Sequence, residues 1–333
     1  MQAMIIRRTG GPEVFELAEI DTPEPGPGEV LIKVLYAGVN PADWKNRQGM
    51  LEQFRPYVFP YIIGFDAAGV IAAVGEGVVD LAVGDRVFTP TNHGQGGQGS
   101  YAQFTIANAD RIAHIPASLS FREAASLPVA SLTAWQGLFV RADLAAGHHA
   151  LIHGGSGGVG SFAVQFARVA GARVAATCSS RNTEYLRKLG VERVIDYTQE
   201  DINAAAAEWA PNGLDYLMDA VGTSSLPNAL DLVRNGGTLV SIPTLVDDGD
   251  IGDAIASAQE RGIKREFSVM DDNNCAPLLS KIAGLLDSGQ IVLPPISEFK
   301  LEDVGAAHET IERGHTRGKI VLQISGDDES SFR

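Results

Sequence analysis

The sequence has only two cysteines, Cys178 and Cys275, in 333 residues. Two cysteines are too few for a disulfide scaffold or a cysteine-rich zinc lobe. The chain also lacks an excess of basic residues, because its formal net charge is −15. Nucleic-acid-binding proteins usually carry a basic surface, and an anionic membrane would repel an acidic chain. We therefore expect neither a nucleic acid nor a membrane as a partner.

Long hydrophobic runs are missing as well. No apolar stretch approaches the roughly 20 residues that span a bilayer. The first residues, MQAMIIRRTGG, contain no apolar segment of the kind that a secretory leader needs. Hydrophobic residues nevertheless make up 45% of the chain, which at this length is enough for more than one buried core. These features predict a cytoplasmic globular protein of about two domains.

The first third of the sequence is rich in valine, isoleucine and glycine, with turn residues at short intervals. Apolar runs interrupted by Gly, Pro or Asp occupy residues 28–39, 67–78 and 84–90. Short strands with frequent turns are typical of a small β barrel or sandwich. The segment DTPEPGPGE at residues 21–29 is a connector, because proline and glycine dominate it.

The pattern changes near residue 120. Ser120, with Glu123 three residues later, predicts the start of a helix. Apolar strand-like runs then alternate with helical or loop segments, which favours βαβ units and a parallel sheet covered on both faces. We expect a helix at residues 276–286, and a strand, a helix and a strand within 292–324. The expected strands of the parallel sheet are residues 150–152, 173–177, 193–195, 214–218, 238–242 and 267–270.

A glycine-rich stretch at residues 151–160 directly follows an apolar run. LIHGGSGGVG contains the pattern Gly155-x-Gly157-x-x-Gly160 between an apolar strand and a helical pattern. In such a motif the first glycine makes a tight turn, the second lets the backbone approach a pyrophosphate, and the third lets helix and strand pack closely. The helix N-terminus supplies free N–H groups and a partial positive charge. We expect the loop, with Ser156, Gly158 and Val159 between the glycines, to bind a dinucleotide.

The end of the next strand lacks the carboxylate that would bind the 2′-hydroxyl of an NAD ribose. Ser179, Ser180 and Arg181 stand there instead. A carboxylate would repel a 2′-phosphate, whereas serine and arginine can hydrogen-bond it. The sequence therefore predicts NADPH rather than NADH, unless Arg181 is simply a solvated surface residue.

Several longer motifs resemble one family. They are YAGVNPADWKNRQG, PYIIGFDAAGVIAAVGEGV, LAVGDRVF, GSYAQF, ASLPVASLTAWQGL, HGGSGGVG and HTRGKIVL. Together they are similar to the medium-chain dehydrogenase/reductase superfamily, in its zinc-free quinone oxidoreductase branch with the zeta-crystallin-like proteins. The resemblance implies an α/β fold with a GroES-like β-rich catalytic domain and a Rossmann domain built on a doubly wound parallel sheet. The implied domains are residues 1–122 with 272–333, and residues 123–271. It also implies a homodimer or homotetramer.

The sequence departs from the zinc alcohol dehydrogenases of that superfamily at the ligand positions. Asn40 and Phe65 stand where those relatives have a cysteine and a histidine, and neither can complete a catalytic zinc shell. We expect no metal. His149 and His153, four residues apart, leave a metal site as an open alternative, although on a strand they would only share a face. We expect Asp66 to be a structural carboxylate that accepts local hydrogen bonds.

Without zinc, the resemblance implies hydride transfer from NADPH to a quinone or an α,β-unsaturated carbonyl. Such a reaction needs a donor for the oxygen on which negative charge develops. Asn40, Lys45 and Asp43 are the catalytic candidates: Asn40 would orient ribose or substrate, Lys45 would face the oxyanion or donate the proton, and Asp43 would hold the charge of Lys45. A surface role for Lys45 and a turn role for Asp43 stay open. Further cofactor candidates, by resemblance or position, are Thr133, Tyr197 and Gly222.

Other functions fit the same sequence. Trp44, Tyr57 and Tyr61 either line a pocket for a flat acceptor or pack in the core. The loop at residues 92–100 is expected to flank the cleft. The relatives often carry an Arg-Pro pair where this chain has VMDDNN. The resemblance therefore does not identify the electron acceptor. A trans-acting enoyl reductase and a non-catalytic NADPH-binding sensor are the alternatives to a quinone or enone reductase.

Overall fold

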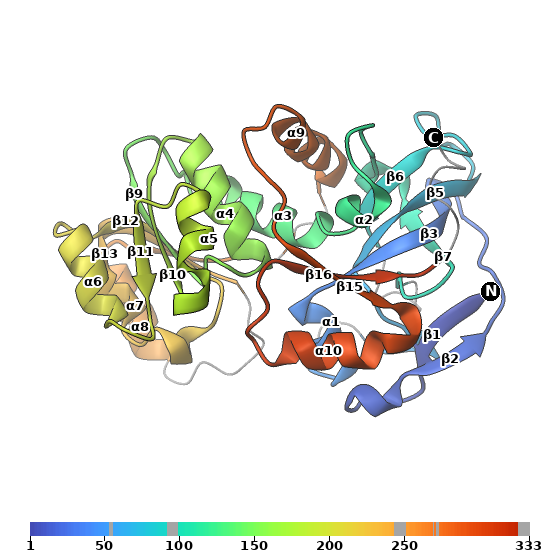
Figure 1. The fold of residues 1–333 in the computed structure, drawn as a ribbon, viewed down its shortest axis with the longest axis horizontal. Helices are drawn as coiled ribbons and strands as arrows, with labels where there is room; N and C mark the ends of the chain where they lie inside the picture. The colour runs from blue at the N-terminus through green and yellow to red at the C-terminus, as the bar shows by residue number, and fades with distance from the viewer. Residues whose placement is uncertain (53–55, 92–98, 243–250, 269, 271–272, 326–333) are drawn as a thin grey trace. The chain divides into compact units, whose positions relative to one another are not determined.

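The computed structural model of the chain describes residues 1–52, 56–91, 99–242, 251–268, 270 and 273–325. It divides into two compact units (Figure 1). Unit 1 comprises Met1–Leu132, Asp271–Gly289 and Pro295–Arg333, and unit 2 comprises Thr133–Met270 and Gln290–Pro294. The boundaries of the two functional domains, near residues 122 and 272, stay a prediction because compactness alone does not define a functional domain.

Unit 1 is the β-rich part that the frequent turns predict. One sheet has the order β15-β16-β3-β5-β6-β8, and β7 also pairs with β3. The long strand β3 (Glu29–Val39) is its centre, because β5, β7 and β16 all pair with it in antiparallel register. The other strands are β5 (Asp66–Val74), β6 (Arg86–Pro90), β7 (Phe104–Asn108), β8 (Ala113–His114), β15 (Ile296–Lys300) and β16 (Lys319–Gln323).

A smaller antiparallel sheet, β2-β1-β4, completes this unit. A buried apolar cluster joins this sheet to the ends of β3 and β16 and to the helix α10, through residues such as Ile5, Tyr61 and Val304. The late elements α10 and β16 therefore pack with the first strand of the chain. The elements are β1 (Gln2–Ile6), β2 (Glu16–Glu19), β4 (Tyr61–Ile62), α1 (Pro41–Arg47), α2 (Phe121–Ala124), α9 (Cys275–Asp287) and α10 (Val304–Glu312).

The helix expected after residue 120 begins as predicted but is interrupted. Ser120 Oγ accepts the backbone N–H of Glu123, and the Glu123 carboxylate accepts the backbone N–H of Ser120. This capping box starts α2, which ends at Ala124. A second helix, α3 (Pro128–Trp135), begins at a proline. A proline cannot continue a helix from within but fits its first turn, which explains the break.

Unit 2 contains the six-stranded parallel sheet that the alternating pattern predicts, in the order β11-β10-β9-β12-β13-β14. β9, the first strand of this sheet in chain order, lies in the middle, so the chain winds first to one side of it and then to the other. The strands are β9 (His149–His153), β10 (Arg173–Cys178), β11 (Arg193–Asp196), β12 (Leu214–Asp219), β13 (Val233–Ser241) and β14 (Lys264–Phe267). The last strand ends where the sequence predicted residues 267–270 to begin.

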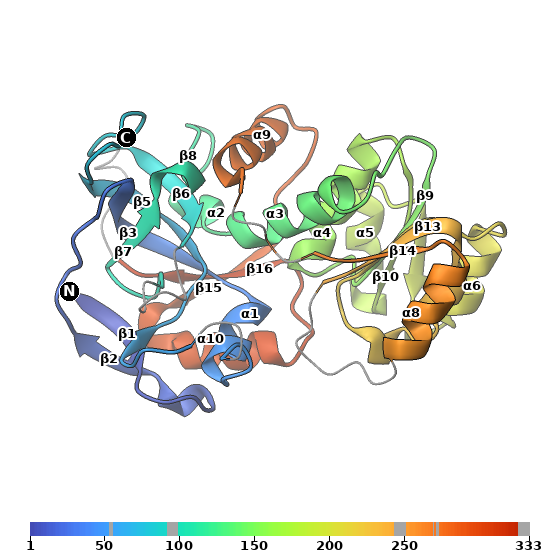
Figure 2. The ribbon, with the colours of Figure 1, turned by 180° about the vertical axis from the view of Figure 1, so that it is seen from behind.

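Helices lie on both faces of this sheet (Figures 1 and 2). Alternate residues of a strand point to opposite faces. Leu151, Ala175 and Leu217 pack with the small residues of α6, α7 and α8 in one buried cluster, while α4 and α5 contact β10. This is the doubly wound arrangement. The helices are α4 (Gly158–Val169), α5 (Thr183–Lys188), α6 (Ile202–Trp209), α7 (Ala229–Leu232) and α8 (Ile251–Glu260).

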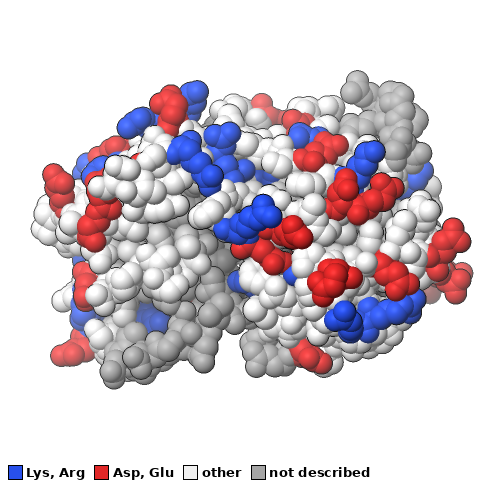
Figure 3. Space-filling model, turned by 60° about the horizontal axis from the view of Figure 1, so that its bottom comes forward, with Lys and Arg blue, Asp and Glu red and all other residues white. Residues whose placement is uncertain are grey.

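The surface carries both signs of charge. On the face drawn in Figure 3, acidic side chains are interspersed with basic ones. Within the described ranges, no helix is both long enough and apolar enough to cross a membrane.

Candidate functional site

The carboxyl edge of the parallel sheet is where the glycine loop lies. Because β9, β10 and β12 run in the same direction, the residues that follow them meet at one edge. The chain turns to opposite sides of β9 as it continues to β10 and to β12. Nucleotides bind open α/β sheets at such a switch point.

The glycines of this loop have distinct surroundings. The positive φ of +83° that the turn requires belongs to Gly154, which the sequence motif did not include. At Gly155 a Cβ would lie 2.7 Å from the Cβ of Ala176 on β10, so this glycine permits close packing on the sheet. At Gly160 a Cβ would lie 2.8 Å from the Cα of Gly155, so helix and loop approach backbone to backbone.

Gly157 is the position open to a ligand. It is the N-cap of α4, and apart from its neighbours in the chain the only described heavy atom within 4 Å of a Cβ placed there is the carbonyl oxygen of Gly154, at 3.5 Å. The first N–H groups of a helix have no partner within that helix. A twelve-residue helix that begins at an open glycine fits a pyrophosphate, as the sequence predicted. Ser156 Oγ is fixed beside it by the side-chain amide of Asn182, at 3.1 Å.

The residues predicted to meet a 2′-phosphate follow β10 directly. Ser179 caps a short 3-10 turn formed by Ser180–Asn182. The hydroxyl of Ser180 donates to Asp196 Oδ2 at 2.5 Å, a contact with the end of β11 that the sequence did not reveal. This hydrogen bond lowers the pKa of Asp196. Tyr197, next in the chain, is 45% exposed.

Thr133 and Gly222 lie in the same unit. Thr133 is buried in α3, and its carbonyl oxygen accepts the hydroxyl of Ser268 at 3.0 Å. Gly222 has a φ of +133° in the turn that follows β12. The carboxylate of Asp219 accepts the N–H of Gly222 at 2.9 Å and thereby fixes this turn. The structure thus brings Gly222 to the edge that carries the glycine loop.

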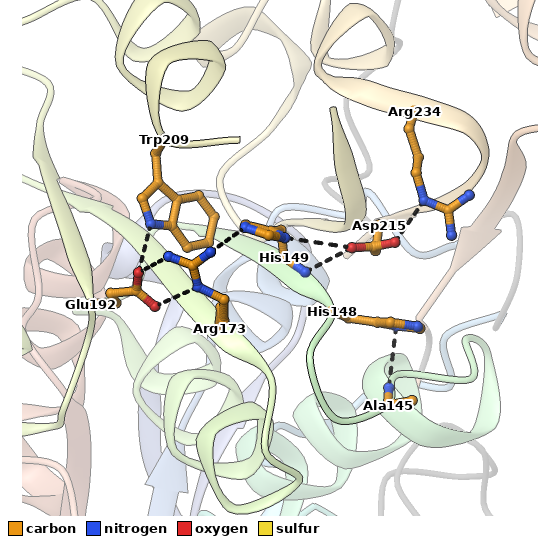
Figure 4. A network of polar contacts seen from close by, with 8 residues as sticks. All are labelled: Ala145, His148, His149, Arg173, Glu192, Trp209, Asp215 and Arg234. Carbon is orange, nitrogen blue, oxygen red and sulfur yellow. Dashed lines mark hydrogen bonds and ion pairs between the residues drawn. The ribbon is translucent and has the colours of Figure 1, made fainter. Parts of the chain in front are cut away.

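The amino edge of the same sheet carries charged side chains instead (Figure 4). His149, at the start of β9, lies 2.8 Å from a guanidinium nitrogen of Arg173, and its backbone N–H donates to Asp215 at 2.8 Å. Arg173 also pairs with Glu192. His153 is at the other end of the strand, about 13 Å from His149 at the usual rise per residue. The two histidines therefore cannot share a metal ion.

A second polar cluster belongs to unit 1, at the start of α1. Asn40 is the N-cap of this helix, and its backbone N–H donates to Asp43 Oδ2 at 2.7 Å. Asn40 Nδ2 donates to Asp66 Oδ2 at 2.8 Å. Asp66 Oδ1 also accepts the N–H of Val129, so its expected role as a local acceptor is confirmed. All these side chains are buried.

A buried lysine that the sequence did not single out completes this cluster. Lys319 Nζ donates to Asn40 Oδ1 at 2.5 Å and lies 3.5 Å from Asp66 Oδ2. The amide of Asn40 is therefore held at both ends, with its oxygen toward an ammonium and its nitrogen toward a carboxylate. Such a contact fixes which way the amide points.

Asp43 is fully buried. Loss of hydration is the largest cause that raises its pKa from 3.8 to about 8, and the nearby charge of Asp66 adds to it. A hydrogen bond with the side chain of Tyr101 opposes this rise in the pKa of Asp43. The hydroxyl of Tyr101 also lies 3.2 Å from His308 Nε2. The cation that acts on Asp43 is Lys319 rather than Lys45.

This ionisation predicts a pH dependence of stability. The folded protein holds a proton on Asp43 up to about pH 8, whereas the unfolded chain releases it near pH 3.8. The stabilisation is complete below the unfolded pKa and is lost as pH rises through the folded pKa. Between pH 3.8 and about pH 8, each unit by which the pH rises therefore lowers the free energy of unfolding by up to about 1.4 kcal/mol. Asp43→Asn is expected to remove that slope in urea titrations at pH 5, 6 and 7, and equal slopes in both proteins would contradict the assignment.

Lys45 lies two residues after Asp43 on α1. Its side chain is buried, and this desolvation lowers its pKa. Its ammonium lies 5.6 Å from the centre of the Trp44 ring. A surface role is therefore wrong for this residue. Within the part of the chain that the structure describes, no carboxylate forms an ion pair with it.

Two of the aromatic residues near α1 pack against each other, which is the packing role that the sequence left open. Tyr61 is 1% exposed, belongs to the apolar core of unit 1, and accepts a hydrogen bond from Asn46. Tyr57 packs against it with ring centres 5.3 Å apart. The loop at residues 92–98, expected to flank the cleft, lies outside the described residues. Among the residues that are described, no group of three or more His, Cys, Asp or Glu side chains is placed to hold a metal.

Comparison with known proteins matches this architecture. Residues 26–117 match the family described as alcohol dehydrogenase GroES-like domain, and residues 189–322 match the family described as zinc-binding dehydrogenase. An NADPH-dependent alkenal/one oxidoreductase of Arabidopsis thaliana chloroplasts is 34% identical, with 97% of this chain and 79% of that protein covered. The quinone oxidoreductase of Mus musculus is 33% identical, with 97% and 98% covered. The structure of a quinone oxidoreductase from Coxiella burnetii superimposes with a TM-score of 0.87 at 32% identity, with 98% and 99% covered.

The chain therefore belongs to the medium-chain dehydrogenase/reductase superfamily. Within it, the chain is a member of the zinc-free branch that contains the quinone oxidoreductases. The fold class predicted from the sequence is confirmed.

Proposed function

We propose that this protein is an NADPH-dependent oxidoreductase that reduces quinones or α,β-unsaturated carbonyl compounds without zinc. The observation that carries the proposal is similarity along nearly the whole chain to proteins named for these reactions. The open glycine turn at the start of α4 supports it independently. When bound, NADPH supplies the hydride.

The residues of unit 2 would hold this cofactor. The N–H groups at the start of α4, with Gly157 open to them, would bind the pyrophosphate. Ser179, Ser180 and Arg181 would bind the 2′-phosphate, and the exposed Tyr197 would pack beside it. No carboxylate occupies the end of β10, although Asp196 reaches Ser180 from β11.

The residues around α1 would serve the substrate. Lys45 is a desolvated ammonium without a paired carboxylate among the described residues. Such a group stabilises negative charge on a carbonyl oxygen more strongly than a solvated lysine does. Asn40 would be oriented by Lys319 and Asp66, and Asp43 would act by fixing the first turn of the helix. The proton that completes reduction would come from solvent or from Lys45.

The first test is a panel of acceptors. Purified protein treated with EDTA is mixed with NADPH or NADH and with quinones, 2-alkenals or an enoyl thioester, and the absorbance of the reduced nicotinamide is followed. Turnover with NADPH that survives chelation is expected. Turnover confined to the thioester would favour a trans-acting enoyl reductase, and binding without turnover would favour a sensor.

Arg181 is expected to decide the choice of cofactor. A charge-assisted hydrogen bond lost from a phosphate costs about 1.5–3 kcal/mol. Arg181→Ala should therefore raise the KM for NADPH roughly 10- to 100-fold and leave that for NADH unchanged. The matched control is Arg187→Ala on α5, whose side chain is 64% exposed. If Arg181→Ala altered both cofactors equally, Arg181 would not bind the 2′-phosphate.

We further propose that the protein is a cytoplasmic homo-oligomer, a dimer or a tetramer. β14 pairs with β13 on one side and with no other described strand. Its last residue, Phe267, is 54% exposed. Pairing of two such edges would extend the sheet across subunits. Light scattering of the wild type tests this: a mass of two or four chains is expected, and a mass of one chain would contradict the proposal.

A further inference from the structure

His153, the last residue of β9, joins the two turns at the nucleotide edge. The residue is 3% exposed. Nδ1 lies 2.8 Å from the hydroxyl of Thr177 on β10, and Nε2 lies 2.8 Å from the hydroxyl of Ser225. Ser225 ends the 3-10 turn Thr223–Ser225, which follows β12. One imidazole therefore spans from β10 to the turn after β12.

The partners determine where the protons lie. Ser225 Oγ is 2.6 Å from the carbonyl oxygen of Gly222, and a carbonyl oxygen can only accept. The hydroxyl proton of Ser225 is thus used, so His153 Nε2 must donate to Ser225. Thr177 Oγ1 accepts the N–H of Gly154 at 2.9 Å and directs its own proton to Nδ1. His153 is therefore neutral, with its proton on Nε2.

This chain of hydrogen bonds begins and ends at glycines with left-handed backbone. Gly154 has a φ of +83° and opens the nucleotide loop, and Gly222 has a φ of +133°. The backbone of the two strands is also joined here, because the N–H of Ala220 donates to the carbonyl oxygen of His153 at 3.2 Å. A change in the protonation of the ring would alter both turns together.

A second proton on the ring would disrupt the chain. Nδ1–H would face Thr177, whose hydroxyl proton would lose its acceptor. Burial disfavours the charged ring and lowers the pKa of His153 from 6.5, whereas the charge of Asp219 on β12 opposes that shift. On β10, the thiol of Cys178 stays neutral, since burial raises its pKa to about 11. Among the described residues, Asp219 is the charged group that acts on the ring, while Asp196 and Arg187 act on Cys178.

We propose that neutral His153 is a positioning residue for the nucleotide, which holds the turns at Gly154 and Gly222 in register and releases them when the ring is protonated. The inference rests on the proposed binding of NADPH at this edge. It predicts that affinity falls as pH drops through the ionisation of His153, by up to about tenfold per pH unit for a single proton.

The test measures the Kd of NADP⁺, which withstands acid, by calorimetry between pH 5 and pH 8. His153→Gln keeps an amide N–H that can reach Ser225 but cannot be protonated in this range. We expect the affinity of the wild type to fall on acidification, relative to a flatter profile for His153→Gln. The phosphate of the nucleotide titrates equally with both proteins and cancels in the comparison. Parallel profiles would overturn the proposal.

A second variant keeps the test valid if His153→Gln does not fold. Ser225 is exposed, so Ser225→Ala leaves the core intact and removes the hydrogen bond between Ser225 and His153. It should weaken NADP⁺ binding severalfold at every pH and preserve the pH dependence. Unchanged affinity would contradict a positioning role. If the wild type failed to bind NADP⁺ even at pH 8, the proposed function itself would fail, which is a different result from parallel profiles.

Discussion

Lys45→Met is expected to lower kcat with an enone or quinone by roughly 10²–10³-fold, the usual loss when one donor to a developing oxyanion is removed. The residue is buried, its pKa is lowered by desolvation, and its ammonium lies beside the Trp44 ring. Methionine preserves the apolar stem and removes only the charge. The Kd for NADPH should not change, because the nucleotide residues lie on other elements. Stopped-flow measurement of a single turnover separates these two quantities.

Two controls accompany this variant. Lys188→Met on α5 removes a lysine whose side chain is 73% exposed, and it should leave kcat unchanged. Lys45→Arg keeps the charge and should retain part of the activity. If Lys45→Met turned over at the wild-type rate while folded, Lys45 would have a packing role only.

Gly160→Ala is expected to raise the Kd for NADPH roughly 100-fold or more. The added Cβ would lie 2.8 Å from the Cα of Gly155 and closer still to the carbonyl oxygen of Gly154. Both are backbone atoms, so the loop itself must move. Overpacking of this kind costs about 1–3 kcal/mol in stability, and here it also displaces the N–H groups that would meet the pyrophosphate. Fluorescence titration with NADPH gives the Kd, and thermal unfolding reports the stability.

Gly284→Ala is the matched control, because Gly284 also lies in a helix, α9, and no described atom outside its own helix lies within 4 Å of a Cβ placed there. It should leave NADPH binding unchanged and stabilise the protein by up to about 1 kcal/mol. Equal binding by both variants would show that the close approach at Gly160 does not shape the nucleotide site.

The sequence predicted those parts of the fold that depend on local pattern. The strands from β9 to β13 lie where apolar runs follow turn residues, and the capping box at Ser120 and Glu123 starts α2. The predicted position of β14 was a few residues too late in the chain, because the residues of this strand, Lys-Arg-Glu-Phe, do not form an apolar run. Edge strands are partly exposed, so they lose the pattern by which buried strands are recognised.

The candidate site was only partly predictable because its contacts join distant parts of the chain. Lys319 reaches Asn40 across 279 residues of sequence, and in sequence it resembles any lysine at the start of a strand. His153 is similar, since its partners come from two later elements. In contrast, Asn40 and Asp43 form an N-cap pattern that could have been recognised from spacing alone, which would have assigned Asp43 to the helix cap rather than to Lys45.

The most direct test of the central claim follows the hydride itself. NADPH labelled with deuterium at C4 of the nicotinamide is incubated with a 2-alkenal and EDTA-treated protein, and the product is examined by mass spectrometry and NMR. We predict one deuterium at the β-carbon of the saturated aldehyde, with the α-proton taken from solvent. Deuterium at the carbonyl carbon, or a loss of transfer after EDTA treatment, would contradict a zinc-free reductase of activated double bonds.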